Sequence, residues 1–136
     1  MKSLFLSSVF LMLSILSTAN LQAQQENNYV VLTKKVPQLQ PIILAAKALK
    51  AEDGTSFGDF QVIICGKGIK AITQPEEING FIEKAEEVGV QIVACGFSLN
   101  KFQVDQTKIP KEIKTVENGI LYNFQLQKKN YKSISL

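Results

Sequence analysis

The residues that decide the fold are 61–96, which read QVIICGKGIKAITQPEEINGFIEKAEEVGVQIVACG. This stretch begins and ends with short apolar runs, at 61–65 and 90–95, and each run predicts a buried β-strand because both of its faces are apolar. Between the two runs, Pro75 and the two glutamates after it predict the start of a helix that continues to about Val88. A strand, a helix and a strand in this order predict a parallel βαβ unit.

The same alternation of apolar runs and amphipathic segments continues on both sides of this unit. Upstream, residues 29–33 predict a first strand, and residues 39–51 predict a helix with one apolar face. Downstream, Ser98 is expected to cap a short helix that ends near Gln103. The remaining segments are expected to form a strand, a helix and a strand, at 113–116, 118–128 and 131–136. The sequence therefore predicts an α/β fold, a small doubly wound domain built on a parallel sheet.

The first 23 residues have the pattern of a signal peptide. Lys2 is followed by an apolar stretch over residues 4–16, and no acidic residue occurs before Glu26. The apolar stretch is shorter than the roughly 20 residues that a membrane-spanning helix needs, so a retained anchor is the less favoured interpretation. Cleavage is expected after Ala23 rather than after Ala19, which leaves a protein that is exported to the periplasm or secreted. The expected organisation is a signal peptide at 1–23, a polar leader at 24–28 and one domain at 29–136.

Composition and charge restrict the class of protein. With 136 residues, of which 46% are hydrophobic and 20% charged, the chain can build one compact core. Its 15 Lys and Arg residues nearly balance its 12 Asp and Glu residues and do not cluster with aromatic residues, so no nucleic-acid partner is expected. The sequence contains no histidine, which excludes Ser-His-Asp and Cys-His sites, and two cysteines alone make a poor zinc site. No cofactor and no metal are therefore expected.

The loop after the strand at 61–65 contains Gly66, Lys67 and Gly68, which fit a loose dinucleotide-binding pattern. This pattern needs an acidic residue at the end of the next strand, where Cys95 stands instead, so dinucleotide binding is disfavoured. Two interpretations stay open for the loop. Its glycines serve only a tight turn, or its backbone amides bind a small anion.

Cys65 and Cys95 end the two buried strands, and a glycine follows each of them. The carboxyl ends of parallel strands are where ligands and chemistry gather, and helix amides at that edge can stabilise a thiolate. A reactive thiol at Cys95 is the leading interpretation, while two buried packing residues and a disulfide remain open. A disulfide requires that the two strands are adjacent and in step, because neighbouring strands lie about 4.8 Å apart.

Several stretches of the sequence resemble the DsrE/DsrF-like proteins. These are ILAAKAL at 43–49, VIICGKGI at 62–69, GVQIVACGFSL at 89–99, VENGI at 116–120, LQ at 126–127 and YKSI at 131–134. The resemblance covers nearly the whole domain, in order and with similar spacing. It implies a three-layer α/β/α fold around a mainly parallel five-stranded sheet, and assembly into trimers or hexamers.

In several members of this family a cysteine carries sulfur as a persulfide in relay pathways, and Cys95 stands at the matching position. The second strand of close relatives exits through His-Gly-x-Gly, whereas here Cys65 replaces the histidine and Gly66 and Gly68 remain. This departure removes a candidate acid or base. The predicted export signal is a second departure, because the family's sulfur carriers work in the cytoplasm, where thiols stay reduced.

The function expected from the resemblance is sulfur transfer, or persulfide carriage, through Cys95 in an exported DsrE-like protein. Partners would be further copies of the chain and a sulfur donor or acceptor protein, with no stable membrane insertion after cleavage. Two alternatives stay open, a non-enzymatic oligomeric binding module with structural cysteines and a small-anion or nucleotide binder at the loop of Gly66 to Gly68. The candidate substrate- or anion-binding residues are Cys65, Gly66, Lys67, Gly68, Gly96 and Ser98.

Overall fold

The computed structural model describes residues 25–136, so the predicted signal peptide lies outside the described residues. Five strands form one sheet in the order β4-β3-β2-β1-β5, and every neighbouring pair is parallel. The strands are β1 (Asn27–Thr33), β2 (Phe57–Ile64), β3 (Val90–Cys95), β4 (Lys114–Val116) and β5 (Lys132–Ser135). The prediction of an α/β fold with a parallel five-stranded sheet is therefore confirmed.

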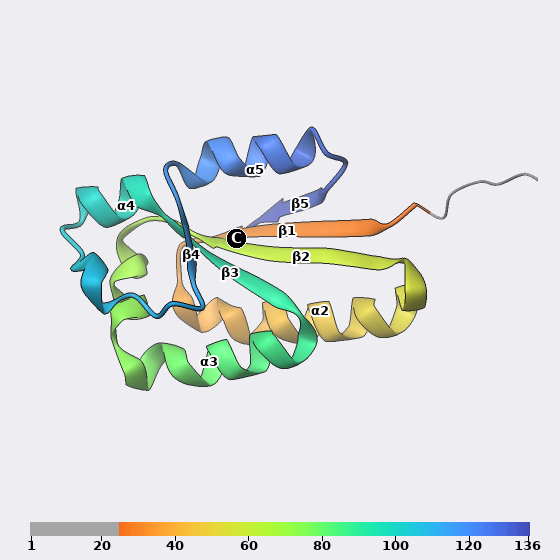
Figure 1. Ribbon diagram of the computed structural model, residues 1–136, viewed down its shortest axis with the longest axis horizontal. Coiled ribbons are helices and arrows are strands. Elements are labelled where there is room, and N and C mark those ends of the chain that lie inside the picture. The colour runs from red at the N-terminus through yellow and green to blue at the C-terminus, as the bar shows by residue number, and fades with distance from the viewer. Residues whose placement is uncertain (1–24) are drawn as a thin grey trace, which may run out of the picture.

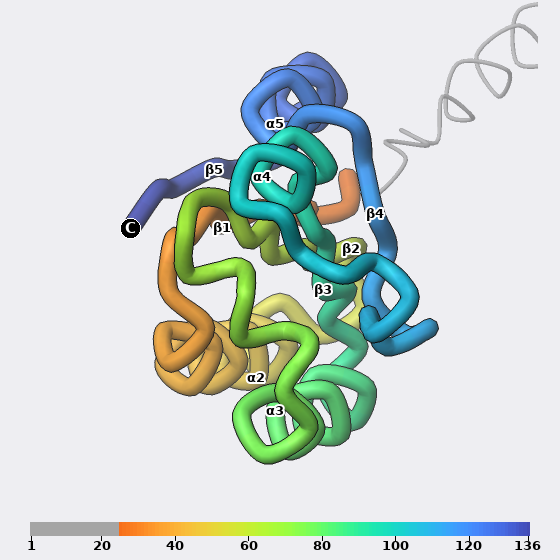
Figure 2. Tube along the Cα trace, turned by 90° about the vertical axis from the view of Figure 1, so that its left-hand side faces the viewer, coloured from red at the N-terminus to blue at the C-terminus, as the bar shows by residue number. Residues whose placement is uncertain are grey.

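Helices cover both faces of this sheet. The α-helices are α2 (Leu39–Asp53), α3 (Pro75–Val88), α4 (Gly96–Lys101) and α5 (Gly119–Gln127). Short 3-10 segments lie at Val36–Gln38, Gly54–Ser56, Lys67–Thr73 and Gln106–Lys108. Helices α2 and α3 lie side by side on one face, and α5 lies on the opposite face, so the domain has three layers (Figures 1 and 2). The chain runs from β1 to β4 across the sheet and then returns through α5 to β5 at the far edge.

Local sequence explains the βαβ unit at the centre of the fold. Helix α3 begins with Pro75 at its first turn, next to Glu76 and Glu77, and ends at Gly89, whose φ of 90° is a left-handed conformation. Strand β3 has the bounds that its apolar run predicts. Its burial on both faces follows from the helices that cover the two sides of the parallel sheet (Figures 1 and 2).

Two strands begin earlier than the sequence predicts. Strand β1 starts at Asn27, inside the segment expected to be a polar leader, and β2 starts at Phe57, before the strand predicted at 61–65. A side-chain contact explains both extensions, because the Asp59 amide donates a hydrogen bond of 2.7 Å to the side-chain oxygen of Asn28. Gly58 sits directly against that Asn28 side chain, where a larger residue would not fit. These polar residues therefore pair as strand although their sequence is typical of a turn.

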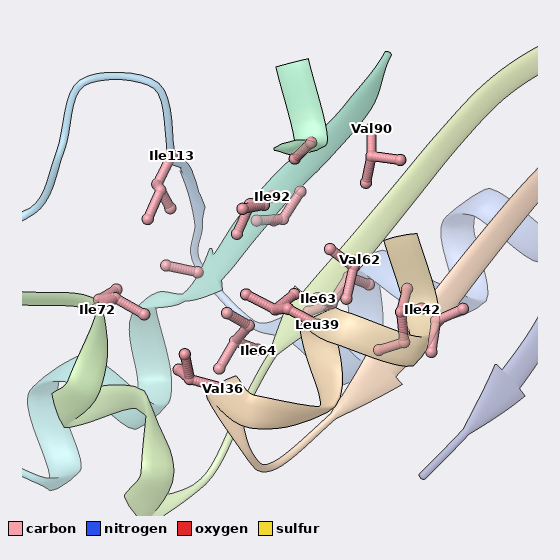
Figure 3. Close-up of a cluster of buried hydrophobic side chains, with 14 of the residues drawn as sticks. Val36, Leu39, Ile42, Val62, Ile63, Ile64, Ile72, Val90, Ile92 and Ile113 are labelled. Atoms are coloured by element: carbon pink, nitrogen blue, oxygen red, sulfur yellow. The ribbon is translucent and has the colours of Figure 1, made fainter. Parts of the chain in front are cut away.

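The hydrophobic core lies between the sheet and the pair α2 and α3. Val62, Ile63 and Ile64 of β2 have no exposed surface, and the sheet packs onto helix residues such as Leu39 and Ile42 (Figure 3). Full burial of one aliphatic side chain of this size stabilises a fold by about 1.5–3 kcal/mol. Strand β2 is thus held rigidly on both sides, and its carboxyl end has a fixed position.

Helix α5 packs differently from the other long helices. It buries Gly119, Asn123 and Leu126 against the sheet, whereas Ile120, Leu121 and Phe124 are each more than half exposed. Apart from Leu126, the large aliphatic side chains of α5 and its Phe124 therefore face outward. Within residues 25–136, none of the helices combines the length and the apolar character that crossing a bilayer requires.

Candidate functional site

The two cysteines lie next to each other at the carboxyl edge of the sheet. Strands β2 and β3 are adjacent and parallel, and their register pairs Ile64 with Ala94. The next residues along the two strands are Cys65 and Cys95, so the thiols lie in step on neighbouring strands. Both cysteines are free thiols, and the strand arrangement meets the condition that the sequence set for a disulfide.

Both thiols lie beneath the first turn of α5. A Cβ atom placed on Gly119 would lie 2.6 Å from the Cys65 sulfur and 3.0 Å from Cys95 Cβ. It would also lie 2.8 Å from a methyl group of Ile63, two residues before Cys65 on the same face of β2. Cys65 is 7% exposed and Cys95 is 3% exposed. Only a glycine lets the helix approach the two cysteines this closely.

The surroundings of Cys95 favour its ionised form. The backbone amide of Gly119 donates a hydrogen bond of 3.2 Å to the Cys95 sulfur. Burial alone would raise the pKa of Cys95, but hydrogen bonding from the Ser98 side chain, from the Gly119 and Ser98 amides and from the Cys65 thiol outweighs it. The pKa of Cys95 therefore lies below that of an ordinary thiol. A buried thiolate of this kind is a nucleophile that needs no histidine.

Cys65 has the opposite character. Burial, followed by the negative charge of Cys95 and hydrogen bonding to it, raises the pKa of Cys65 to about 12. The Lys34 ammonium partly opposes this shift by its positive charge. At neutral pH the pair therefore consists of one protonated thiol, Cys65, and one sulfur that ionises readily, Cys95.

Ser98 holds the site together, in a role that the sequence did not predict. The expected cap is wrong: α4 begins at Gly96 with Cys95 in the capping position, and Ser98 lies inside the helix. Its hydroxyl accepts a hydrogen bond of 2.8 Å from the backbone amide of Gly66. The same hydroxyl lowers the pKa of Cys95. Ser98 thus links the loop after β2 to the sulfur at the end of β3.

Removing this hydroxyl should change both acidity and stability. In Ser98→Ala we expect the pKa of Cys95 to rise and the free energy of unfolding to fall by about 1 kcal/mol, because the Gly66 amide loses its partner. Iodoacetamide modification as a function of pH reports the first change, and urea denaturation reports the second. Thr73→Ala removes an exposed hydroxyl that bonds only Lys70 and serves as the control. An unchanged pH profile in Ser98→Ala would show that the hydroxyl does not act on Cys95.

The structure brings together some of the predicted site residues and separates others. Cys65, Gly66, Ser98 and Cys95 form one cluster. Gly68 packs against the backbone of residue 34, where a Cβ would lie 2.2 Å from the carbonyl oxygen, and the Lys67 side chain is exposed.

Gly96 is also a packing residue. A Cβ on it would lie 2.8 Å from the Val116 carbonyl oxygen. The Gly66 amide already donates to Ser98, so one of the amides expected to bind an anion is engaged within the protein. Anion binding by the other backbone amides of the loop at 66–68 stays a prediction. It is supported by the turn, because successive backbone amides in a turn can bind an anion.

Three residues of the site were missed by sequence reasoning. Gly119 and its capping residue Asn118 lie far from the cysteines in sequence, and Lys34 follows β1. Asn118 does carry a local signal, since its side chain accepts hydrogen bonds from the Ile120 and Leu121 amides as a helix cap does. That signal marks a helix start but cannot place it over Cys95. The described residues contain no group of three potential metal ligands.

Comparisons with known proteins bear on the fold alone. No family model and no curated protein matches the sequence. Two solved structures, each of a protein of unknown function, resemble the chain. MTH1491 from Methanobacterium thermoautotrophicum is 16% identical with a TM-score of 0.70, and the match covers 82% of this chain and 100% of that one. BT1422 from Bacteroides thetaiotaomicron is 17% identical with a TM-score of 0.59, over 80% and 95% of the two chains. The chain therefore shares its α/β/α fold with proteins of known structure.

Proposed function

We propose that this protein transfers or carries sulfane sulfur on Cys95, as an exported DsrE-like protein. The observation that carries the proposal is the hydrogen bond of 3.2 Å from the Gly119 amide to the Cys95 sulfur, at the first turn of α5. This bond gives the buried sulfur a hydrogen-bond donor that stabilises its negative charge. Together with Ser98, the Gly119 amide lowers the pKa of Cys95. The resemblance of the sequence to sulfur carriers names the reaction class.

The reaction needs only the groups that surround Cys95. Its thiolate attacks the outer sulfur of a donor persulfide, R–S–SH, and a new sulfur–sulfur bond forms on Cys95. The bond between the two donor sulfurs breaks, and its electron pair leaves with the donor thiolate. The Gly119 amide and the Ser98 hydroxyl stabilise the negative charge before attack and on the persulfide afterwards.

Access to Cys95 requires a local movement. The sulfur belongs to a residue that is 3% exposed, and its cover is the backbone of Gly119 rather than a bulky side chain. We infer that the first turn of α5 lifts to admit a donor, because the helix is short and leaves Ile120, Leu121 and Phe124 facing outward. The Lys34 side chain lies against Gly66 and near Cys65, and its positive charge would attract an anionic donor.

Mass spectrometry tests the proposal directly. After incubation with inorganic polysulfide, the intact chain should gain about 32 Da, the mass of one sulfur atom added as a persulfide. Dithiothreitol should remove the adduct, and Cys95→Ser should never form it, whereas Cys65→Ala should. An absence of adduct on both the wild-type chain and Cys65→Ala with polysulfide, thiosulfate and low-molecular-weight persulfides would remove sulfur carriage as the function.

We propose further that the protein works as a homo-oligomer. The exposed apolar residues of α5 and the neighbouring Ile134 of β5, which is 59% exposed, support this, since water-exposed apolar clusters mark interaction surfaces. The trimer or hexamer itself is expected from the family resemblance alone. A sulfur donor or acceptor protein would be a second partner, and the predicted signal peptide supports export.

Charging the outer face of α5 should dissociate this assembly. In sedimentation velocity the wild-type chain is expected to run as a trimer or hexamer, and Phe124→Lys as smaller species, because a buried lysine would be left without a partner. Leu44 on α2 is exposed to nearly the same extent, 57% against 59% for Phe124, so Leu44→Lys is the matched control. A monomeric wild type, or equal effects of both variants, would contradict the proposed interface.

The burial of both thiols also favours a second candidate, a binding module whose cysteines only pack. A thiol count on native protein separates the two. Rapid modification of one thiol supports sulfur carriage, and two thiols that react only after denaturation support the binding module.

A further inference from the structure

The two cysteines form a pair that is built for direct exchange. Each cysteine directly follows one member of the pair Ile64 and Ala94 on the adjacent strands β2 and β3. Both cysteines also lie close to Gly119. Cα atoms at such positions fall in the range of about 4.4–6.8 Å that a disulfide needs.

The pair is also chemically asymmetric. Cys95 receives hydrogen bonds and ionises readily, whereas Cys65 keeps its proton and directs it toward Cys95. In exchange between thiols and disulfides, one sulfur accepts the incoming group and a second, protonated neighbour resolves it. Cys65 and Cys95 have these two characters and lie in contact.

We propose that Cys65 discharges Cys95: the Cys65 sulfur attacks the inner sulfur of a Cys95 persulfide, the two residues become a disulfide, and hydrogen sulfide leaves. This inference rests on the proposed function, because it takes Cys95 as the residue that carries the sulfane sulfur. It adds a product, sulfide, and a catalytic role for Cys65.

The step balances without a group from outside the site. A bond forms between the Cys65 and Cys95 sulfurs, and the bond between the Cys95 sulfur and the outer sulfur breaks. The electron pair of the broken bond and the proton of the Cys65 thiol both go to the outer sulfur, which leaves as hydrogen sulfide. Cys65 is oxidised and the outer sulfur is reduced to sulfide. A dithiol reductant then returns the disulfide to two thiols for the next cycle.

The charges around Cys65 favour its ionisation once the persulfide has formed on Cys95. The negative charge of Cys95 is one cause of the raised pKa of Cys65, and a persulfide moves that charge outward onto the added sulfur. Lys34 then remains as a positive charge that favours ionisation of Cys65. In an exported protein the resulting disulfide is stable, so turnover would depend on the supply of a dithiol reductant.

Intact mass and sulfide release together test the proposal. The wild-type chain is loaded with inorganic polysulfide, freed of excess reagent, and followed under anaerobic conditions without reductant. We expect the adduct of about 32 Da to decay to a species about 2 Da lighter than the reduced chain, with release of about one sulfide per adduct. Peptide mapping should then join the peptides of Cys65 and Cys95. In Cys65→Ala the adduct should last at least about ten times longer and yield no lighter species.

Gly80→Ala, in an exposed turn of α3 with open space around it, should discharge at the wild-type rate and controls for handling. A wild-type adduct as long-lived as that of Cys65→Ala, with no lighter species, would overturn the inference and leave sulfur carriage intact. An adduct that never forms on either protein would overturn both. Should Cys65→Ala fail to fold, the peptide map of the wild-type chain decides alone.

Discussion

Gly119→Ala should destabilise the protein and shift the reaction of Cys95 to higher pH, although the same change in most helices is neutral or stabilising. The added Cβ would lie 2.6 Å from the Cys65 sulfur and 2.8 Å from a methyl group of Ile63, which is fully buried and β-branched. Neither neighbour can turn away, so the first turn of α5 has to lift. Overpacking of this kind costs about 1–3 kcal/mol. Lifting the turn also removes the Gly119 amide from the Cys95 sulfur.

The measurement pairs two glycines of the same chain. Gly80→Ala lies in a helix with open space where the added Cβ would stand, so it should stabilise the fold by about 0.5–1 kcal/mol. Urea denaturation should therefore move in opposite directions for the two variants. In Gly119→Ala the pH profile of iodoacetamide modification should move to higher pH, because the Cys95 thiolate loses the hydrogen bond from the Gly119 amide and the pKa of Cys95 rises. Equal stabilities for both variants would disprove the close approach of α5 to the cysteine pair.

Alkylation should be strongly selective for Cys95 over Cys65. Modification follows the thiolate, and a pKa of about 12 leaves Cys65 ionised in only about one molecule in 10⁵ at pH 7. Cys95 has a lowered pKa, so its rate should reach a plateau at a lower pH than an ordinary thiol and fall as the pH drops through that pKa. Peptide mapping after brief treatment at pH 7 should find at least about a hundredfold more label on Cys95.

Each thiol affects the pKa of the other, so the variants Cys95→Ala and Cys65→Ala serve as controls for this prediction. The negative charge of Cys95 and hydrogen bonding to it help to raise the pKa of Cys65, so Cys95→Ala should lower the pKa of Cys65 and make it more reactive. In Cys65→Ala the Cys95 sulfur loses a hydrogen bond and should react over a slightly higher pH range. Labelling of Cys65 before Cys95 in the wild-type chain would reverse the assignment of the nucleophile.

The fold could be predicted in large part because short stretches of sequence determine the elements of its central βαβ unit. The bounds of α3 and β3 follow from Pro75, Gly89 and an apolar run, and each signal acts within a few residues. The extensions of β1 and β2 could not be predicted in this way. They depend on a side-chain oxygen of Asn28 that bonds the Asp59 amide across two strands, which is a tertiary contact.

The site was predicted in part for the same reason. The equivalent strand ends placed Cys65 and Cys95 at one edge, but one of the donors to the Cys95 sulfur, the Gly119 amide, comes from α5, after the chain has crossed the sheet. Ser98 has a residue type that favours a helix cap, yet its hydroxyl bonds Gly66 in another loop. Local propensity therefore located the sulfur atoms, whereas the acidity of Cys95 depends also on Gly119 and Cys65, which are distant from it in sequence.

The proposed sulfur chemistry requires that Cys95 ionises beneath the first turn of α5. A pH titration by NMR of protein labelled with ¹³C at the cysteine Cβ atoms follows each sulfur separately, with assignments from Cys65→Ala and Cys95→Ala. We expect the Cys95 signal to titrate at a lower pH than an ordinary thiol and the Cys65 signal not to move below about pH 10. Titration of Cys95 at or above the ordinary value, or of Cys65 before Cys95, would contradict the proposed sulfur chemistry.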